Sequence, residues 1–213
     1  EDEREKFDSL PAQYSHLYLC IAGELAAVIC IFDPLRAEAK DAIRALHACG
    51  ISKVVMMTGD NRRTAASVAE EVGVDEFYAE VLPEDKAAFI SREKAAGRTV
   101  IMIGDGVNDS PALSEADAGV AISTGAAIAR EIADITIASE DLFELVTLRR
   151  ISEALMGRIH RNYRFIVGFN LGLIVFGVAG LLPPTTSALL HNASTLAISL
   201  KSMTNLLPDK KKI

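Results

Sequence analysis

Apolar and polar positions alternate along the first two thirds of the chain in short blocks that predict strands and helices in turn. An apolar run from Leu17 to Phe32, interrupted by Gly23-Glu24, predicts a hairpin of two strands. Asp33 and Pro34 predict the cap and first position of a helix that ends at Gly50. Further blocks predict strands at 51–57, 77–81, 99–103, 119–122 and 135–138, and helices at 61–72, 83–96, 110–116, 126–133 and from about 141. This alternation is typical of an α/β fold with a parallel sheet between helices.

The last part of the chain has a different pattern, because residues 165–200 contain no Asp, Glu, Lys or Arg. Two apolar stretches, about 165–182 and 187–207, predict two transmembrane helices joined by a turn at Pro183-Pro184. Arginines precede the first stretch and lysines follow the second, so the positive-inside rule places both ends of this hairpin in the cytoplasm. We therefore expect an integral membrane protein of the plasma membrane with a cytoplasmic soluble block.

Polar residues recur on one side of the second apolar stretch. At 100° per residue, His191, Thr195, Ser199 and Ser202 lie within a narrow arc, and Asn170 lies in the first stretch. Polar groups in such a setting need partners. This stripe therefore predicts either packing against other helices or a path for an ion or substrate.

Composition narrows the class of protein. The 213 residues are 50% hydrophobic, with a mean hydropathy of +0.24 and a net charge of −7. These values exclude a disordered tail, a collagen-like repeat and a basic protein that binds nucleic acid. The three cysteines show no C-x-x-C spacing, so we expect buried thiols and neither a zinc site nor a disulfide framework.

Three loops at predicted strand or helix boundaries carry candidate chemistry. After strand 51–57 comes Thr58-Gly59-Asp60-Asn61, whose hydroxyl and helix N–H groups can hold a phosphoryl oxygen. After strand 99–103 comes Gly104-Asp105-Gly106-Val107-Asn108-Asp109, whose two carboxylates form a magnesium-binding pattern. Between them, Pro83-Glu84-Asp85-Lys86 begins a helix and supplies an ammonium group. In a parallel sheet such loops meet at one edge, so we expect a single site.

These three loops resemble three signatures of the P-type cation-transporting ATPases, and the run Gly104 to Leu113 is the most specific of them. The chain is similar to the C-terminal part of such an ATPase over nearly its whole length. The resemblance implies the end of a nucleotide-binding domain at 1–32 and a phosphorylation domain at 33–145 with the haloacid-dehalogenase fold. It also implies a linker helix and two transmembrane helices over 146–213.

The same resemblance implies a role for each loop residue. Asp105 and Asp109 would bind a Mg²⁺ cofactor, and ATP would be the substrate. Thr58 would contact the phosphoryl group, Asp60 would help to orient the attacking water, and Lys86 would neutralise charge on an acyl phosphate. The implied catalytic residues are Thr58, Gly59, Asp60, Lys86 and Asn108.

A chain with only two spans after the phosphorylation domain resembles the heavy-metal subgroup of this family. The implied partners are a lipid bilayer and a transition-metal cation: zinc, cobalt, manganese, iron or copper. Histidine and hydroxyl groups suit borderline divalent ions. The residues that would contact the transported ion are His191, Ser194, Thr195 and Ser199.

One family motif does not occur in the sequence, namely the Asp-Lys-Thr-Gly-Thr segment that carries the phosphorylated aspartate. The family places this motif before the nucleotide-binding domain. We therefore expect a missing N-terminal part of the same pump to carry it. The chain alone would be inactive, with an incomplete sheet whose edge is exposed where the nucleophile strand is missing.

Two other functions stay open at this point. A membrane-anchored phosphatase of the same fold would use Asp33 as its nucleophile, because Asp33 follows the apolar run 28–32. Such enzymes usually carry a second aspartate two residues later, whereas position 35 is Leu. The other alternative is a non-catalytic membrane module that binds magnesium or phosphate, or regulates a complete pump.

Overall fold

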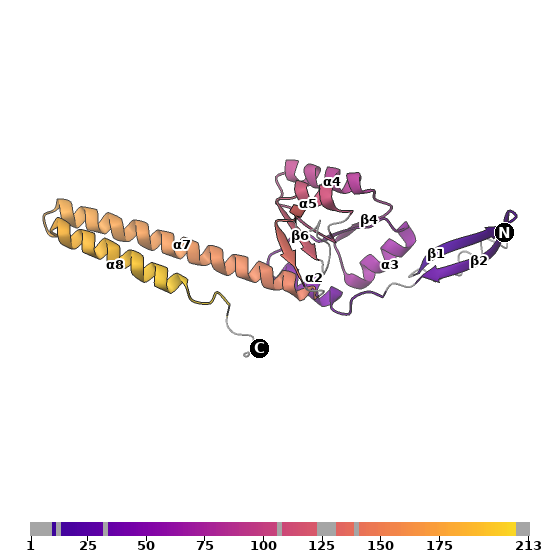
Figure 1. Ribbon diagram of the computed structural model, residues 1–213, viewed down its shortest axis with the longest axis horizontal. Helices are drawn as coiled ribbons and strands as arrows, with labels where there is room; N and C mark the ends of the chain where they lie inside the picture. Colours follow the sequence, from indigo (N-terminus) through magenta and orange to yellow (C-terminus); the bar gives the residue numbers. More distant parts are fainter. Residues whose placement is uncertain are drawn as a thin grey trace. The chain divides into compact units, whose positions relative to one another are not determined.

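The computed structural model describes residues 10–11, 14–31, 34–105, 108–122, 131–138 and 141–207 (Figure 1). The chain forms two compact units, residues 1–146 and 147–213. Each unit is described by itself.

The first unit contains the predicted alternation of strands and helices. Its elements are β1 (Ser15–Ile21), β2 (Glu24–Ile31), α2 (Ala39–Ala48), β3 (Val55–Met57), α3 (Arg62–Val72), β4 (Glu76–Tyr78), α4 (Pro83–Ala95), β5 (Ile101–Gly104), α5 (Ser110–Glu115), β6 (Ala118–Ile122) and β7 (Ile135–Ile137). Most of the predicted helix at 126–133 lies outside the described residues.

The strands pair in three groups. β1 and β2 form the predicted antiparallel hairpin, β3 pairs in parallel with β4, and β5, β6 and β7 form a parallel sheet in that order. The predicted α/β class with parallel strands is therefore confirmed. Among the described residues, β3 and β5 do not pair with each other, so the parallel strands form two hydrogen-bonded pieces.

A shared core holds these two pieces in one unit. Ile90 of α4, Met102 of β5 and Leu113 of α5 are buried together, and Met57 of β3 packs against this cluster. Burying such side chains contributes roughly 1.5–3 kcal/mol each. The ends of β3 and β5 are thus held in the same part of the unit.

Local sequence signals explain most helix boundaries. The Asn61 side chain accepts a hydrogen bond from the Thr64 amide at 3.0 Å and caps α3, which ends at Gly73 in a left-handed conformation. Pro83 is the first residue of α4. The predicted helix start at Pro34 is wrong, because α2 begins at Ala39 after a turn in which the Ala39 amide bonds to Arg36 O.

The β1–β2 hairpin differs from the rest of the unit because most of its side chains are exposed, including Leu17 and Ile29. Cys20 and Cys30 on these strands are exposed as well, and Cys49 is half-buried. The predicted burial of the thiols is therefore wrong: the hairpin strands pair with each other and present both faces to solvent in this chain.

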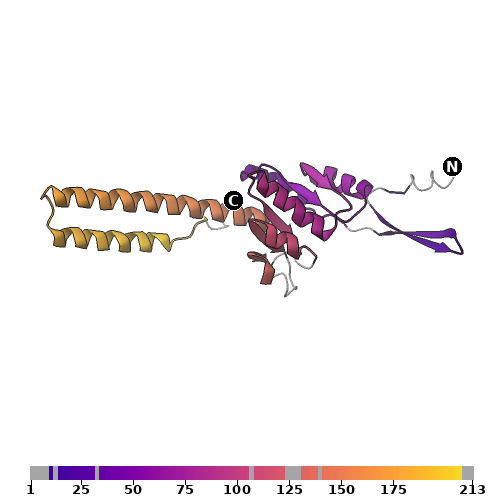
Figure 2. The ribbon, with the colours of Figure 1, turned by 90° about the horizontal axis from the view of Figure 1, so that it is seen from above.

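The second unit contains most of α7 (Phe143–Val178) and all of α8 (Pro184–Ser202). In Figures 1 and 2 the two helices run side by side in opposite directions, and Gly180 in the connection has a φ of 72°. The two predicted helices therefore exist as a hairpin.

The structure does not support the prediction that this hairpin spans a membrane. No helix of the described residues is both long enough and apolar enough for that. The reason lies in the boundaries. α7 ends at Val178, four residues before the predicted end, and its earlier part carries Arg158, Arg161 and Arg164. α8 begins at Pro184 and carries many hydroxyl groups.

Candidate active site

The loop after β3 is held by its own side chains. The Thr58 hydroxyl donates a hydrogen bond to Asp60 Oδ2 at 2.8 Å, and the Asp60 amide donates one to Thr58 Oγ1 at 3.1 Å. Asn61, not Asp60, caps the following helix. The Asp60 carboxylate is therefore not engaged as a helix cap and stays beside the Thr58 hydroxyl.

The connection between β4 and α4 holds the same loop from the other side. The Thr58 amide donates to Tyr78 O at 3.0 Å, the Glu80 amide to Asp60 O at 2.9 Å, and the Val81 amide to Thr58 O at 3.0 Å. Gly59 lies close to this connection, since a Cβ added there would be 3.9 Å from Val81 O. These bonds join segment 58–60 to segment 78–81 through the backbone.

Lys86 of α4 and Asp109 form an ion pair. Lys86 Nζ donates to Asp109 Oδ1 at 2.7 Å, and the side chains are 16% and 13% exposed, so the pair is largely shielded from water. Hydrogen bonds between charged groups are shorter and stronger than neutral ones. Two residues that are 23 positions apart in the sequence thus meet at the carboxyl end of β5.

Asp109 also lies against the last residue of β5. A Cβ at Gly104 would come within 2.6 Å of Asp109 Oδ2, so only glycine leaves room for the carboxylate at this place. Asp105 follows β5 directly, and its side chain and that of Asn108 are exposed. Gly106 and Val107 lie outside the described residues.

Carboxylates of this kind are ligands that Mg²⁺ prefers. Asp105 and Asp109 supply two of them near the carboxyl end of β5. The described residues contain no group of three or more His, Cys, Asp or Glu side chains that could hold a metal ion. A magnesium site here would therefore use these two carboxylates, with its remaining ligands from water, phosphate or other parts of the protein.

The polar stripe of the second unit forms hydrogen bonds between the two helices. His191 Nδ1 lies 2.9 Å from Asn170 Oδ1, and Asn162 Nδ2 donates to Ser202 Oγ at 3.0 Å. The hydroxyls of Ser194 and Thr195 both donate to the backbone oxygen of His191. Part of the stripe thus packs against α7, one of the two arrangements that the sequence predicts. Ser199 is exposed.

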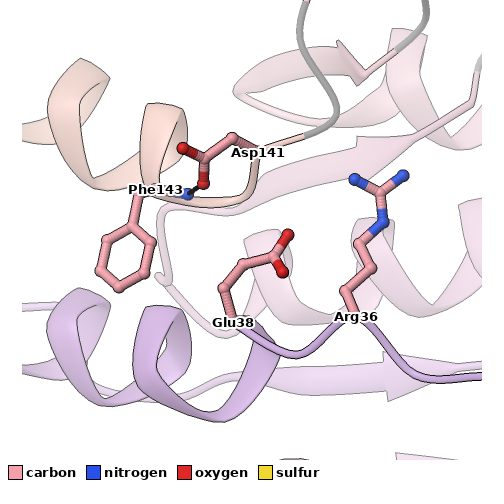
Figure 3. A pocket seen from close by; sticks show the side chains of 4 residues that line it. All are labelled: Arg36, Glu38, Asp141 and Phe143. Atoms are coloured by element: carbon pink, nitrogen blue, oxygen red, sulfur yellow. Dashed lines mark hydrogen bonds between the residues drawn. The ribbon is translucent and has the colours of Figure 1, made fainter.

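A shallow hollow that sequence reasoning did not predict is lined by Arg36, Glu38, Asp141 and Phe143 (Figure 3). Asp141 Oδ1 accepts a hydrogen bond from the Phe143 amide at 2.9 Å, as Figure 3 shows. None of the loop residues described above lines it. Asp33, the alternative nucleophile, lies outside the described residues.

A family profile described as haloacid dehalogenase-like hydrolase matches residues 2–117, more than half of the chain. The chain belongs to the haloacid dehalogenase-like hydrolase family. Copper-transporting ATPase 2 of Rhizobium meliloti (strain 1021) is 46% identical over 176 residues, which are 83% of this chain and 21% of that protein. The manganese-exporting P-type ATPase of Mycobacterium bovis is 40% identical over 183 residues, 85% of this chain and 26% of that protein.

Solved structures agree with these relatives. The crystal structure of a zinc-transporting PIB-type ATPase in its E2.Pi state aligns with this chain at a TM-score of 0.80 and 30% sequence identity. The alignment covers 95% of this chain and 33% of that structure. The resemblance to a heavy-metal P-type ATPase is thereby confirmed. The chain spans about a fifth to a third of the length of these relatives.

Proposed function

We propose that this chain is the C-terminal part of a pump that couples Mg²⁺-dependent ATP hydrolysis, through an aspartyl-phosphate intermediate, to the transport of a transition-metal cation. The observation that carries the proposal is the Lys86–Asp109 ion pair. It brings a cation and a carboxylate from two separate loops to the end of β5, in a chain whose relatives are named as metal-transporting ATPases.

In this function, each loop contributes a group that binds the phosphoryl group, neutralises its charge or orients the attacking water. Lys86 neutralises negative charge on the acyl phosphate, and the Thr58 hydroxyl binds one of its oxygens. Asp60 orients the attacking water, while Asn108 supports the loop of Asp105. Phosphoryl transfer depends mainly on such positioning and charge neutralisation, and these residues contribute to both.

Asp105 and Asp109 are the residues that would hold Mg²⁺, which supplies positive charge to the phosphoryl oxygens when bound. The donor chemistry fits, since both side chains are carboxylates and Asp109 has space only because residue 104 is glycine. Lys86 already compensates the charge of Asp109 in the structure described. It therefore holds this carboxylate in place.

The nucleophile must come from a part of the pump outside this chain, since its motif does not occur in the sequence. We place its strand between β3 and β5. Two observations support this place: β3 and β5 do not pair among the described residues, and Met57 and Met102 on these strands nevertheless share one core. A strand there would bring its aspartate to the edge where the Thr58 loop and the Lys86–Asp109 pair begin.

For the transported cation, we propose His191 as a ligand, with hydroxyls of Ser194, Thr195 and Ser199 nearby on α8. His191 Nδ1 lies 2.9 Å from Asn170 Oδ1, so Nε2 is the ring nitrogen that we assign to the metal. A histidine held by its other ring nitrogen is the usual arrangement of a metal ligand. Imidazole and hydroxyl donors favour borderline divalent ions such as zinc, cobalt, manganese or iron.

The first test is the size of the natural gene product, detected with an antibody against residues 208–213. A product several times heavier than 22.9 kDa would supply the missing nucleophile. A product of 22.9 kDa would contradict the proposal that the chain is part of a pump, and it would favour a binding or regulatory module.

The second test uses the complete protein. Asp105→Asn should lower metal-stimulated ATP hydrolysis by about a hundredfold or more, because one charge at the phosphoryl site is lost. Asp41→Asn is the control, since Asp41 is an exposed residue that pairs with Arg44. Equal activity of both variants would contradict the assigned role.

A further inference from the structure

Glu80 has an unusual backbone conformation for its residue type. Its φ is 58°, in the left-handed region, and the only other non-glycine residue with positive φ among those described is Ala22 in the hairpin turn. Side chains with a Cβ adopt this conformation at a cost, and glutamate is not among the residues that tolerate it best. Such a conformation persists only where surrounding bonds hold it.

Two of the bonds that hold it reach the candidate active site. The left-handed turn lets consecutive amides, those of Glu80 and Val81, face the Thr58–Asp60 segment, and they donate to Asp60 O and Thr58 O. The Thr58 amide in turn donates a hydrogen bond to Tyr78 O. The backbone on both sides of Gly59 is thus fixed by the turn at Glu80.

The side chain of Glu80 takes no visible part in this arrangement. It is exposed, and it forms no hydrogen bond or ion pair with another described residue. The following residues, Leu82 and Pro83, begin α4, which carries Lys86 four residues into the helix. The turn therefore lies between the two groups that the proposed function assigns to the phosphoryl group.

We propose that Glu80 is a positioning residue that acts through its left-handed backbone and not through its carboxylate. It holds the Thr58–Asp60 loop in the geometry needed to bind the phosphoryl group and orient water, a role that rests on the proposed function. The consequence is a specific order of substitutions. Gly and Asn, which adopt the left-handed region readily, should preserve the loop, whereas Ala and above all the β-branched Val should disturb it.

The first experiment tests the backbone and needs no catalytic activity. Hydrogen exchange of the Thr58, Glu80 and Val81 amides is measured in the 213-residue chain and in Glu80→Gly, Glu80→Asn, Glu80→Ala and Glu80→Val. Exchange should stay within about twofold of the parent in the Gly and Asn variants and become about tenfold faster or more in the Val variant, with Ala between them. Glu71→Val is the matched control, because Glu71 is an exposed glutamate inside α3.

Two results would overturn the proposal. One is equal exchange in all four variants, which would mean that the loop does not depend on the turn. The other is exchange in Glu80→Gly as fast as in Glu80→Val, which would assign the role to the side chain. Should Glu80→Val fail to fold, the comparison of the other variants decides the question, since exchange should be slower in Glu80→Gly and Glu80→Asn than in Glu80→Ala.

The second experiment uses the complete protein and separates this role from a general loss of stability. Decay of the phosphoenzyme should slow about tenfold in Glu80→Val, with the KM for ATP unchanged within about twofold, and Glu80→Gly should restore the parent rate. Unchanged decay in Glu80→Val would overturn the role of Glu80. Absence of any phosphoenzyme in the parent would instead contradict the proposed function, while the exchange experiment would still decide whether Glu80 holds the loop.

Discussion

The two units of this chain differ in how far they bury their side chains. The first unit buries Ile90, Leu113 and Val120 almost completely and shields the Lys86–Asp109 pair beside its strands. In the second unit, α8 has no buried residue, and apolar side chains of α7 such as Ile174 are more than half exposed. A long apolar run therefore does not ensure burial, because burial needs a partner surface. Polar contacts between elements occur in both units, as Lys86–Asp109 and Asn162–Ser202 show.

The largest expected effect in this comparison comes from breaking the shielded ion pair. Lys86→Met leaves the Asp109 carboxylate without its partner in a site that is mostly closed to water, so the free energy of unfolding should fall by about 2–3 kcal/mol. Urea unfolding measures this loss. Adding Asp109→Asn to Lys86→Met should recover part of it, because the uncompensated charge is then removed.

Lys40→Met is the control for that pair, since Lys40 is exposed, and it should change stability by no more than about 0.5 kcal/mol. A cost of Lys86→Met as small as that of the control would show that the pair behaves like a surface ion pair. Shielding of the ion pair would then no longer distinguish the first unit from the second.

Glycine-to-alanine substitutions compare the packing of the two units directly. At Gly104, an added Cβ meets the Asp109 carboxylate at 2.6 Å, so Gly104→Ala should cost about 1–3 kcal/mol. At Gly168 in α7 nothing lies within 4 Å, and Gly168→Ala should stabilise the helix by up to about 1 kcal/mol. Thermal unfolding of both variants measures the two changes in stability. A change of the same sign in both variants would contradict the expected difference in packing.

A smaller effect is expected from the contact that joins the interior of α7 to the C-terminal end of α8. The Arg158 guanidinium donates to the backbone oxygens of Ser202, Thr204 and Asn205 at 2.7–3.0 Å. Because this site is exposed, Arg158→Ala should cost only about 1 kcal/mol, measured by thermal unfolding. Arg164→Ala on the same helix is the control, and an equal cost for both would mean that these three bonds add nothing.

The smallest effect concerns a surface pair away from both candidate sites. The hydrogen bond from Lys53 lowers the pKa of Glu76, and the same bond raises the pKa of Lys53, while desolvation opposes both shifts. A lowered carboxyl pKa adds stability above the unfolded value near 4.3, and this is lost as the pH falls through the folded value. A raised lysine pKa adds stability below about 10.4, and this is lost as the pH rises through the folded value.

Glu76→Gln should therefore lower Tm by no more than about 2 °C between pH 5 and 10. The difference from the parent should shrink as the pH falls below about 4.3 and vanish once the carboxyl is protonated in the folded state; it should vanish again in strong alkali. A difference that persists after the carboxyl is protonated would show that the glutamate contributes through something other than its charge.

Particular elements show how far sequence reasoning reached. The hairpin, the parallel strands and the starts of α3 and α4 were predictable because turn residues, caps and prolines act within a few positions. The start of α2 and the end of α7 were not, since a proline or an apolar run marks where a helix can lie without stating where its hydrogen bonds begin or stop. Of the candidate site, the sequence predicted that the three loops meet at one edge of the sheet, but not that Lys86 pairs with Asp109. Nothing in the residue type of Glu80 indicated a left-handed turn.

The sequence by itself determined which chemistry the chain carries: a hydroxyl, an ammonium group and carboxylates in three loops, with a glycine beside them, in a member of the haloacid dehalogenase-like hydrolases. Only the tertiary structure decided which of these groups touch, how far water reaches them and where each helix ends. The physical reason is the range of the forces involved. Backbone preferences and caps act between neighbours in the chain, whereas ion pairing, burial and close approach depend on segments that only folding brings together.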